Sequence, residues 1–159
     1  MARMPLEISP MEPADLEATL AVVRESFEAC VAPDYPQEGR DLFARIVTTD
    51  YLNSLSSRQG FVLVAKLDGR VVGMCAIRDG NHITLFFVLT EFQGRGIGRR
   101  LFDATLERVR RNRPGVSRLA VHSSPVAVPV YQALGFSITG AEELEDGIRY
   151  VPMERPLAP

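Results

Sequence analysis

The sequence has few cysteines and no long apolar run. Its two cysteines, Cys30 and Cys75, are far apart in the chain, whereas zinc sites and disulfide frameworks need several cysteines at regular spacing. We therefore expect two buried, reduced thiols and no metal site, and nothing supports a disulfide between them. No uninterrupted apolar stretch approaches the roughly 18 residues of a membrane span, and residues 1–5 lack the apolar segment of a signal peptide. The expectation is a cytoplasmic protein without membrane contact.

An excess of positive charge is also missing. The formal net charge at pH 7 is −2, which argues against an overall surface for nucleic acid. Arginines nevertheless gather around one predicted helix. We interpret those at positions 108–113 as a solvated helix face. For Arg95, Arg99 and Arg100, which lie beside a glycine-rich turn, a phosphate-binding role is left open.

The 159 residues are 46% hydrophobic and 24% charged, which fits one domain spanning residues 1–159 with a core of its own. Apolar residues spaced three or four apart predict the helices, and runs rich in β-branched residues predict the strands. Helices are expected at about residues 13–29, 42–47, 97–113 and 124–134, with a further short one at 51–55. Strands are expected at about residues 6–8, 61–65, 71–77, 82–89, 119–121, 136–144 and 148–153.

Turn residues and connection lengths predict how these strands pair. Asp68-Gly69 and Gly80-Asn81 link three consecutive strands that we expect to be antiparallel, and Asp146-Gly147 closes the last hairpin. A helix separates the strands that end at Leu89 and Val121, so these two should lie parallel. The fold class is therefore α/β (α+β), a mixed, mostly antiparallel sheet flanked by helices with one parallel strand pair.

Prolines interrupt the helical pattern in two places. Residues 32–39 contain two prolines and a glycine, which predicts a connecting loop after the first helix. Pro129 falls inside the helix expected at residues 124–134, where its ring clashes with the carbonyl four residues earlier. We therefore expect the first turn of that helix to be irregular.

The glycine-rich turn at residues 93–98 is the strongest functional signal. It joins an apolar strand to a helix through the sequence Gln93-Gly94-Arg95-Gly96-Ile97-Gly98. Glycines let several backbone N–H groups point at one anion, and the following helix adds the positive end of its dipole. We expect a phosphate group to bind there.

Particular residues argue against two other kinds of phosphate-binding loop. A Walker loop has lysine and then serine or threonine after its last glycine, but Gly98 is followed by Arg99 and Arg100. A dinucleotide loop that starts at Gly94 needs a third glycine at position 99, and the strand before it belongs to an antiparallel meander. Neither a mononucleotide nor a dinucleotide site is expected.

Two motifs together carry a resemblance to a known family. Residues 93–98 match the pattern of Gln or Arg, two residues, Gly, one residue, then Gly or Ala. Downstream, residues 124–136 contain Tyr131 and end in Leu134-Gly135-Phe136. In this order, and separated by a helix and a strand, the motifs resemble those of the GCN5-related N-acetyltransferase (GNAT) family. The resemblance covers most of the chain and is weakest between residues 32 and 57.

The resemblance implies acetyl-CoA as donor substrate and no metal. Backbone N–H groups from Gln93 to Arg99 are implied to bind the pyrophosphate, and the strand before the turn is implied to part from its parallel neighbour and bind the pantetheine arm. The residues implied to bind the cofactor are Val88, Leu89, Thr90, Gln93, Gly94, Arg95, Gly96, Ile97, Gly98, Arg99, Ser124 and Tyr131.

Four residues are candidates for the chemistry, His122 only as an alternative to His82. From its position in the strand that the resemblance implies, the Phe86 N–H is the candidate group for polarising the acetyl carbonyl. Tyr131 is the candidate acid for the departing thiolate, since a phenol is protonated at neutral pH; the alternative is a buried tyrosine bonded to backbone. His82 is the candidate base for the amine, directly or through water, and His122 is a second one; either can instead be a hydrogen-bonding residue of its strand.

These features predict an acyl-CoA-dependent N-acetyltransferase that moves acetyl directly to a primary amine in a ternary complex. A CoA-binding sensor of the same fold is the alternative, and binding of nucleic acid by the arginine-rich helix is a third hypothesis. The acceptor is not encoded in a motif; Asp34 and Glu38 either attract a cationic amine or lie in solvent. Relatives in the family are often dimers, which leaves a homodimer open.

Overall fold

The computed structural model describes residues 5–157; residues 1–4, which entered the expectation about a signal peptide, and residues 158–159 lie outside that range. The strands are β1 (Leu6–Pro10), β2 (Phe61–Leu67), β3 (Arg70–Arg78), β4 (His82–Val88), β5 (Arg118–Ser123), β6 (Ser137–Ile138), β7 (Glu143–Glu145) and β8 (Ile148–Pro156). The helices are α1 (Leu16–Cys30), α2 (Gln37–Ile46), α3 (Thr49–Ser54), α4 (Ile97–Asn112) and α5 (Val128–Ala133). Within residues 5–157, no helix is long and apolar enough to cross a membrane.

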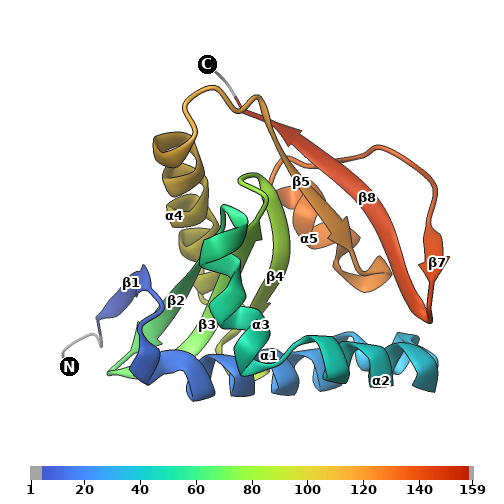
Figure 1. The fold of residues 1–159 in the computed structure, drawn as a ribbon, viewed down its shortest axis with the longest axis horizontal. Helices are drawn as coiled ribbons and strands as arrows, with labels where there is room; N and C mark the ends of the chain where they lie inside the picture. Colours follow the sequence, from blue (N-terminus) through green and yellow to red (C-terminus); the bar gives the residue numbers. More distant parts are fainter. Residues whose placement is uncertain (1–4, 158–159) are drawn as a thin grey trace.

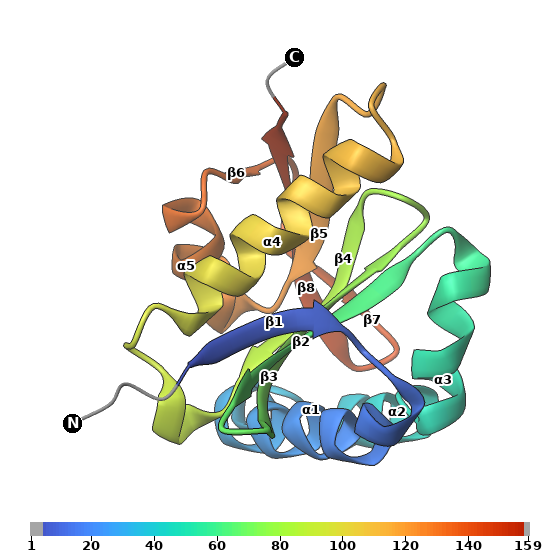
Figure 2. The same cartoon turned by 90° about the vertical axis from the view of Figure 1, so that its left-hand side faces the viewer.

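The eight strands of residues 5–157 form one twisted sheet, with helices on both of its faces (Figure 1). The order is β1-β2-β3-β4-β5-β8-β6, with β7 paired to β8, and β4–β5 is its parallel pair. Figure 2 shows α1 and α2 below the sheet, α3 to its right, and α4 and α5 on the upper left. The mixed, mostly antiparallel α/β fold expected from the sequence is confirmed.

Aspartate–glycine pairs make the hairpins. Asp68 and Gly69, and likewise Asp146 and Gly147, have positive φ angles between 50° and 82°, as a tight two-residue turn with the right twist requires. The turn between β3 and β4 uses Asp79-Gly80, one residue earlier than the Gly80-Asn81 pair expected from the sequence.

The start of α1 is fixed by one buried carboxylate. Asp15 accepts a hydrogen bond from the Glu12 N–H at 2.9 Å and pairs with Lys66 Nζ at 2.8 Å. The hydrogen bond from Lys66 is the main cause that holds the pKa of Asp15 below its usual value. This pair ties α1 to β2, and the apolar residues that follow, including Val23, face the buried core against the sheet.

Strands β4 and β5 separate soon after they meet. Their pairing is limited to His82 with Ala120 and Ile83 with Val121. Beyond that point β5 continues beside β8, whereas β4 continues beside β3 alone. The outer edge of β4 from residue 84 onward therefore faces an opening in the sheet, which is the separation that the family resemblance implied.

A local irregularity accompanies the separation. Between Ile77 and Ala76 of β3, the register of β4 jumps from Ile83 to Leu85 and leaves Thr84 as an extra residue. The Thr84 hydroxyl lies 2.7 Å from the Tyr51 hydroxyl of α3. The bulge bends β4 at the end where it leaves β5, and α3 holds the bent segment from one face.

Two expectations about local structure need correction, and a third is confirmed. The strand expected at residues 136–144 is two short strands, β6 and β7, with Gly140 between them. The loop expected at residues 32–39 contains a short 3-10 turn and ends where α2 begins at Gln37, because Pro36 is extended and caps that helix. Before α5, residues 125–127 form a 3-10 turn, so Pro129 lies in the first turn of α5, which tolerates proline; the irregular start is confirmed.

Candidate active site

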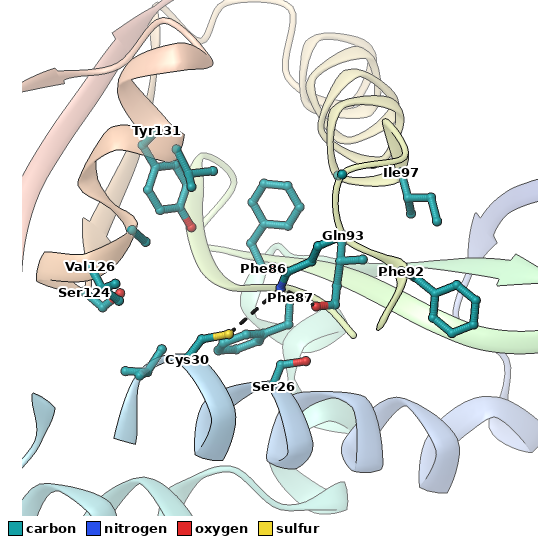
Figure 3. Close-up of a pocket in the computed structure, with 16 residues that line it drawn as sticks. Ser26, Cys30, Phe86, Phe87, Phe92, Gln93, Ile97, Ser124, Val126 and Tyr131 are labelled. Atoms are coloured by element: carbon teal, nitrogen blue, oxygen red, sulfur yellow. Dashed lines mark hydrogen bonds between the residues drawn. The ribbon is translucent and has the colours of Figure 1, made fainter. Parts of the chain in front are cut away.

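A cavity of about 480 Å³ lies where β4 loses its partner. Its walls come from the C-terminal half of α1, the end of β4, the 93–98 turn and the segment from Ser124 to Tyr131. Figure 3 shows these parts converging, with α1 along one side and Tyr131 on the other. The cavity therefore connects the two sequence motifs through the opening in the sheet.

The glycine-rich turn takes a shape that glycine makes accessible. Gly94 and Gly96 have φ angles of 79° and 80°, in the left-handed region that side chains disfavour. Gly96 is the N-cap of α4, whose first intrahelical bond runs from the Arg100 N–H to the Gly96 carbonyl. The N–H groups of residues 97–99 therefore have no helical acceptor and form a site suited to an anion.

Gly98 has a different role in the turn. Its φ is helical, and an added Cβ would meet only Val88 Cγ2 at 3.8 Å and the Phe86 ring at 3.9 Å, which are ordinary contacts. Nothing in the protein's own packing requires glycine here. Gly98 lines the cavity, so a side chain at this position would occupy space inside it.

Backbone groups at the end of β4 point into the opening. The Leu89 N–H donates to the Val72 carbonyl on β3 at 2.9 Å. Because backbone groups alternate sides along an antiparallel strand, those of Phe86 and Val88 point away from β3. The Val88 carbonyl accepts a hydrogen bond from Gln93 Nε2 at 3.0 Å; Figure 3 shows the same nitrogen joined to Cys30 Sγ by a dashed line. The Phe86 N–H is thus directed toward the gap, as the oxyanion prediction requires.

Tyr131 is buried, with 7% of its surface exposed, and its hydroxyl has no hydrogen bond to any residue in the described part of the chain. Burial raises the pKa of this phenol above its usual value. Phe86 and Phe136 pack edge-on against the ring, with centroids 6.2 Å and 5.4 Å away. The hydroxyl faces the cavity (Figure 3), so the alternative of a tyrosine bonded to backbone does not describe it.

The Leu134-Gly135-Phe136 motif explains how Tyr131 is held. The Phe136 N–H donates to the Tyr131 carbonyl at 3.0 Å and closes the end of α5. Gly135 has a φ of 96°, and an added Cβ would lie 2.9 Å from Arg155 Nε. Glycine is therefore required here by conformation and by space, and the turn it makes brings the Phe136 ring onto Tyr131.

Eight of the sequence-predicted site residues line the cavity; they are Phe86, Val88, Gln93, Gly94, Ile97, Gly98, Ser124 and Tyr131. The others lie around it.

The Leu89 side chain is buried in the core and Thr90 is exposed beside Cys30. Arg95 stacks on the Phe92 ring at 5.2 Å, and Arg99 pairs with Asp103 at 3.5 Å. Both arginines and Gly96 are exposed at the mouth of the turn.

The structure does not bring His82 or His122 into the cavity wall. The two rings meet edge to face with centroids 4.8 Å apart, and His122 stacks on Tyr150 at 4.4 Å. Burial, followed by the charges of Arg78 and His122, lowers the pKa of His82 to about 4. The His82 imidazole is therefore neutral at pH 7, and any role as a base requires water to span the distance to the cavity.

This lowered pKa predicts a pH effect on stability. Between pH 6.5 and about 4 the unfolded chain binds a proton at His82 that the folded chain does not, so protonation favours unfolding as the pH falls through this window. His82→Gln is expected to lose less stability than the wild type between pH 7 and pH 4.5. Urea unfolding at the two pH values measures the free energy of unfolding of each protein. An equal loss of stability in His82→Gln and the wild type would contradict the lowered pKa of His82.

Cys30 departs from the expectation of two buried thiols. Cys75 is fully buried, and burial raises its pKa to about 12. Cys30 is only half-buried, lines the cavity, and lies 3.9 Å from Gln93 Nε2. Both cysteines are free thiols. Cys30 occupies the last turn of α1, on the side that faces the opening rather than the core.

Sequence reasoning also missed Ser26, which lines the cavity one turn before Cys30. Its position between Val23 and Phe27 places a hydroxyl on the buried face of α1. A polar residue within this apolar stripe was the signal in the sequence that could have singled out Ser26. In residues 5–157 there is no group of three or more His, Cys, Asp or Glu side chains arranged to hold a metal ion.

Comparisons with known proteins point to one family. The family model described as an acetyltransferase (GNAT) domain matches residues 31–157. An uncharacterized N-acetyltransferase of Archaeoglobus fulgidus is 33% identical over 114 residues, which are 64% of this chain and 72% of that protein. The spore coat polysaccharide biosynthesis protein SpsD of Bacillus subtilis is 29% identical over 136 residues; the match covers 82% of this chain and 47% of SpsD, so the chain spans about half the length of that relative.

Solved structures share the whole fold. A GCN5-related N-acetyltransferase from Rhodopseudomonas palustris, also described as a class-II aminotransferase, superposes with a TM-score of 0.81 at 26% identity over 99% of each chain. The PaiA N-acetyltransferase of Thermoplasma acidophilum, solved in complex with coenzyme A, gives 0.78 at 21% identity over 97% of this chain and 100% of that one. The second likeness concerns the fold alone. With a family model that matches most of its length, the chain belongs to the GCN5-related N-acetyltransferase (GNAT) family of acetyltransferases.

Proposed function

We propose that the protein transfers the acetyl group of acetyl-CoA directly to a primary amine while both substrates are bound. The observation that carries the proposal is the cavity that joins the free N–H groups of the 93–98 turn, the unpaired edge of β4 and the free hydroxyl of Tyr131. A relative named as an N-acetyltransferase and a structural neighbour that binds coenzyme A support this choice of chemistry.

The residues present fit acetyl-CoA. The N–H groups of residues 97–99 and the positive end of α4 suit a pyrophosphate, and Gly98 leaves room in the cavity beside them. The outward backbone groups of Phe86 and Val88 suit the amides of a pantetheine arm, once Gln93 Nε2 releases the Val88 carbonyl. Acetyl-CoA supplies an acetyl thioester, whose carbonyl carbon is open to attack by an amine.

Phe86 and Tyr131 account for the two charges that develop during transfer. The Phe86 N–H donates to the carbonyl oxygen as it becomes negative, from a backbone position fixed by the β3–β4 ladder. Tyr131 donates its proton to the departing thiolate. Its raised pKa keeps the phenol protonated, and the same apolar surroundings raise the pKa of a thiol, as they do for Cys75. Burial therefore shifts the pKa of the phenol and that of the leaving thiol in the same direction.

The amine must lose a proton before it attacks. None of the residues that line the cavity is charged, and an uncharged, desolvated site favours the neutral amine over the ammonium ion. His82 stays the proposed base, acting through water; its lowered pKa leaves it neutral at pH 7 but weak as a base, so it can act only on an amine whose own pKa the apolar site lowers. The cavity and His82 then share the task of deprotonation.

The direct test is a reaction of the purified protein with acetyl-CoA and a primary amine. We expect free thiol and N-acetylated amine to appear in equal amounts, measured by a thiol reagent and by mass spectrometry. Release of thiol without amine, through an acetylated enzyme, contradicts direct transfer. Binding of acetyl-CoA without turnover on any amine supports the sensor alternative instead.

A further inference from the structure

The direction of the Phe86 N–H depends on a shift in the alternation of β4. The Ala120 N–H of β5 donates to the Asn81 carbonyl at 2.9 Å, so the backbone groups of Asn81 face β5. Strict alternation from there would turn the groups of Leu89 toward β5 as well, and those of Phe86 toward β3. The Leu89 N–H instead donates to Val72 of β3 at 2.9 Å. The alternation is therefore shifted by one residue between positions 81 and 89.

Thr84 is the residue that makes this shift. It forms the bulge between Ile83 and Leu85, which pair with consecutive residues of β3. One extra residue reverses the direction of every group that follows it in the strand. The Phe86 N–H is thereby turned out of the β3–β4 ladder and toward the opening. Without the bulge, the group that we propose for the oxyanion would point at β3.

Tyr51 holds the bulge from α3. The hydroxyls of Tyr51 and Thr84 lie 2.7 Å apart in a partly buried contact, and Figure 1 shows α3 in front of β4. A bulged residue is left unpaired in the ladder, so a side-chain hydrogen bond from another element can fix its position. The Tyr51 ring packs against the hydrophobic core, which places the hydroxyl at the bulge.

The support behind Tyr51 is itself attached to the sheet. Leu52, the next residue of α3, is 1% exposed and belongs to the core. The Asp79 N–H donates to the Arg58 carbonyl at 2.8 Å, which joins the turn before β4 to the segment after α3. Both ends of the Tyr51–Thr84 contact are therefore anchored, and the hydrogen bond connects two parts of the fold that are already fixed.

We propose that Tyr51 is a positioning residue for acetyl transfer, because its hydrogen bond to Thr84 keeps the bulge that points the Phe86 N–H at the acetyl carbonyl. Neither Tyr51 nor Thr84 lines the cavity, so their effect passes through the backbone of β4. The charge on the carbonyl oxygen develops during transfer. Loss of the contact therefore slows the chemical step more than it weakens acetyl-CoA binding. The inference rests on the proposed function.

Tyr51→Phe removes the hydroxyl and keeps the packed ring. With phenylethylamine and spermidine as probe amines, we expect kcat to fall about tenfold, since a small misplacement of a catalytic group is costly. The KM for acetyl-CoA should change less than about twofold, because the 93–98 turn is untouched. The matched control is Tyr35→Phe, which loses a tyrosine hydrogen bond outside the cavity and should keep the wild-type kcat. An unchanged kcat in Tyr51→Phe, or an equal fall in both variants, overturns the inference and leaves the proposed function standing.

Substitutions of Thr84 test whether the two hydroxyls act as one unit. Thr84→Val removes the hydroxyl and keeps the branched shape, and the double variant with Tyr51→Phe should be no slower than the slower single variant. Thr84→Ser keeps a hydroxyl and should retain kcat within about twofold of the wild type. Additive losses in the double variant, or a Thr84→Ser protein as slow as Thr84→Val, contradict the assignment. Absence of transfer to both amines by the wild type overturns the proposed function, and this inference with it.

Discussion

Replacing Gly98 with valine is expected to weaken acetyl-CoA binding at least about tenfold, which corresponds to about 1.4 kcal/mol, while the fold stays intact. The added Cβ meets Val88 and Phe86 at ordinary contact distances, and its two methyl groups enter the cavity. Valine is also a better helix residue than glycine, so the melting temperature should be equal or higher. Calorimetric titration with acetyl-CoA measures the affinity.

The control for this variant is Gly115→Val. Gly115 is exposed after α4, and a Cβ there would have no neighbour within 4 Å. This protein should bind acetyl-CoA like the wild type. If Gly98→Val binds as tightly as the control, the cavity beside the turn is not where acetyl-CoA lies.

Replacing Tyr131 with phenylalanine is expected to lower kcat by about two orders of magnitude or more, the usual contribution of a positioned acid. The KM for acetyl-CoA should change little, because the ring that packs against Phe86 and Phe136 remains. The hydroxyl has no partner among the described residues, so its loss should not reduce stability. Steady-state thiol release and a thermal melt give both readouts.

Tyr35→Phe is the matched control. Its hydroxyl donates to the Arg149 carbonyl at 3.1 Å and lies outside the cavity wall. Removing it should lower the melting temperature and leave kcat unchanged, the reverse of the result for Tyr131. A kcat for Tyr131→Phe within about twofold of the wild type would remove the phenol from the mechanism.

Local pattern was sufficient to predict the hairpins and the parallel strand pair of the sheet. Asp68-Gly69 and Asp146-Gly147 encode tight turns through their φ preferences, and the helix at residues 97–112 forces a parallel crossover between its flanking strands. The turn at residues 93–98 could be interpreted as an anion site because the conformation of glycine and the free N–H groups of a helix start are local properties. These features depend on neighbours in sequence, so the sequence reports them directly.

Features that depend on distant neighbours were less predictable. The segment at residues 136–144 has strand-like composition, but Gly140 and the limited edge of β8 leave room for only two short strands. Whether His82 reaches the cavity depends on where β5 leaves β4, which no residue in β4 encodes. Ser26 and Cys30 line the cavity only because α1 packs across the opening in the sheet.

The central claim is that the 93–98 turn and the opening beside β4 bind acetyl-CoA. Calorimetric titration of the wild-type protein with acetyl-CoA tests this claim most directly. The structure predicts saturable binding of one acetyl-CoA per chain and a rise in melting temperature that grows with its concentration. No heat of binding and no change in melting temperature at millimolar acetyl-CoA would contradict the account.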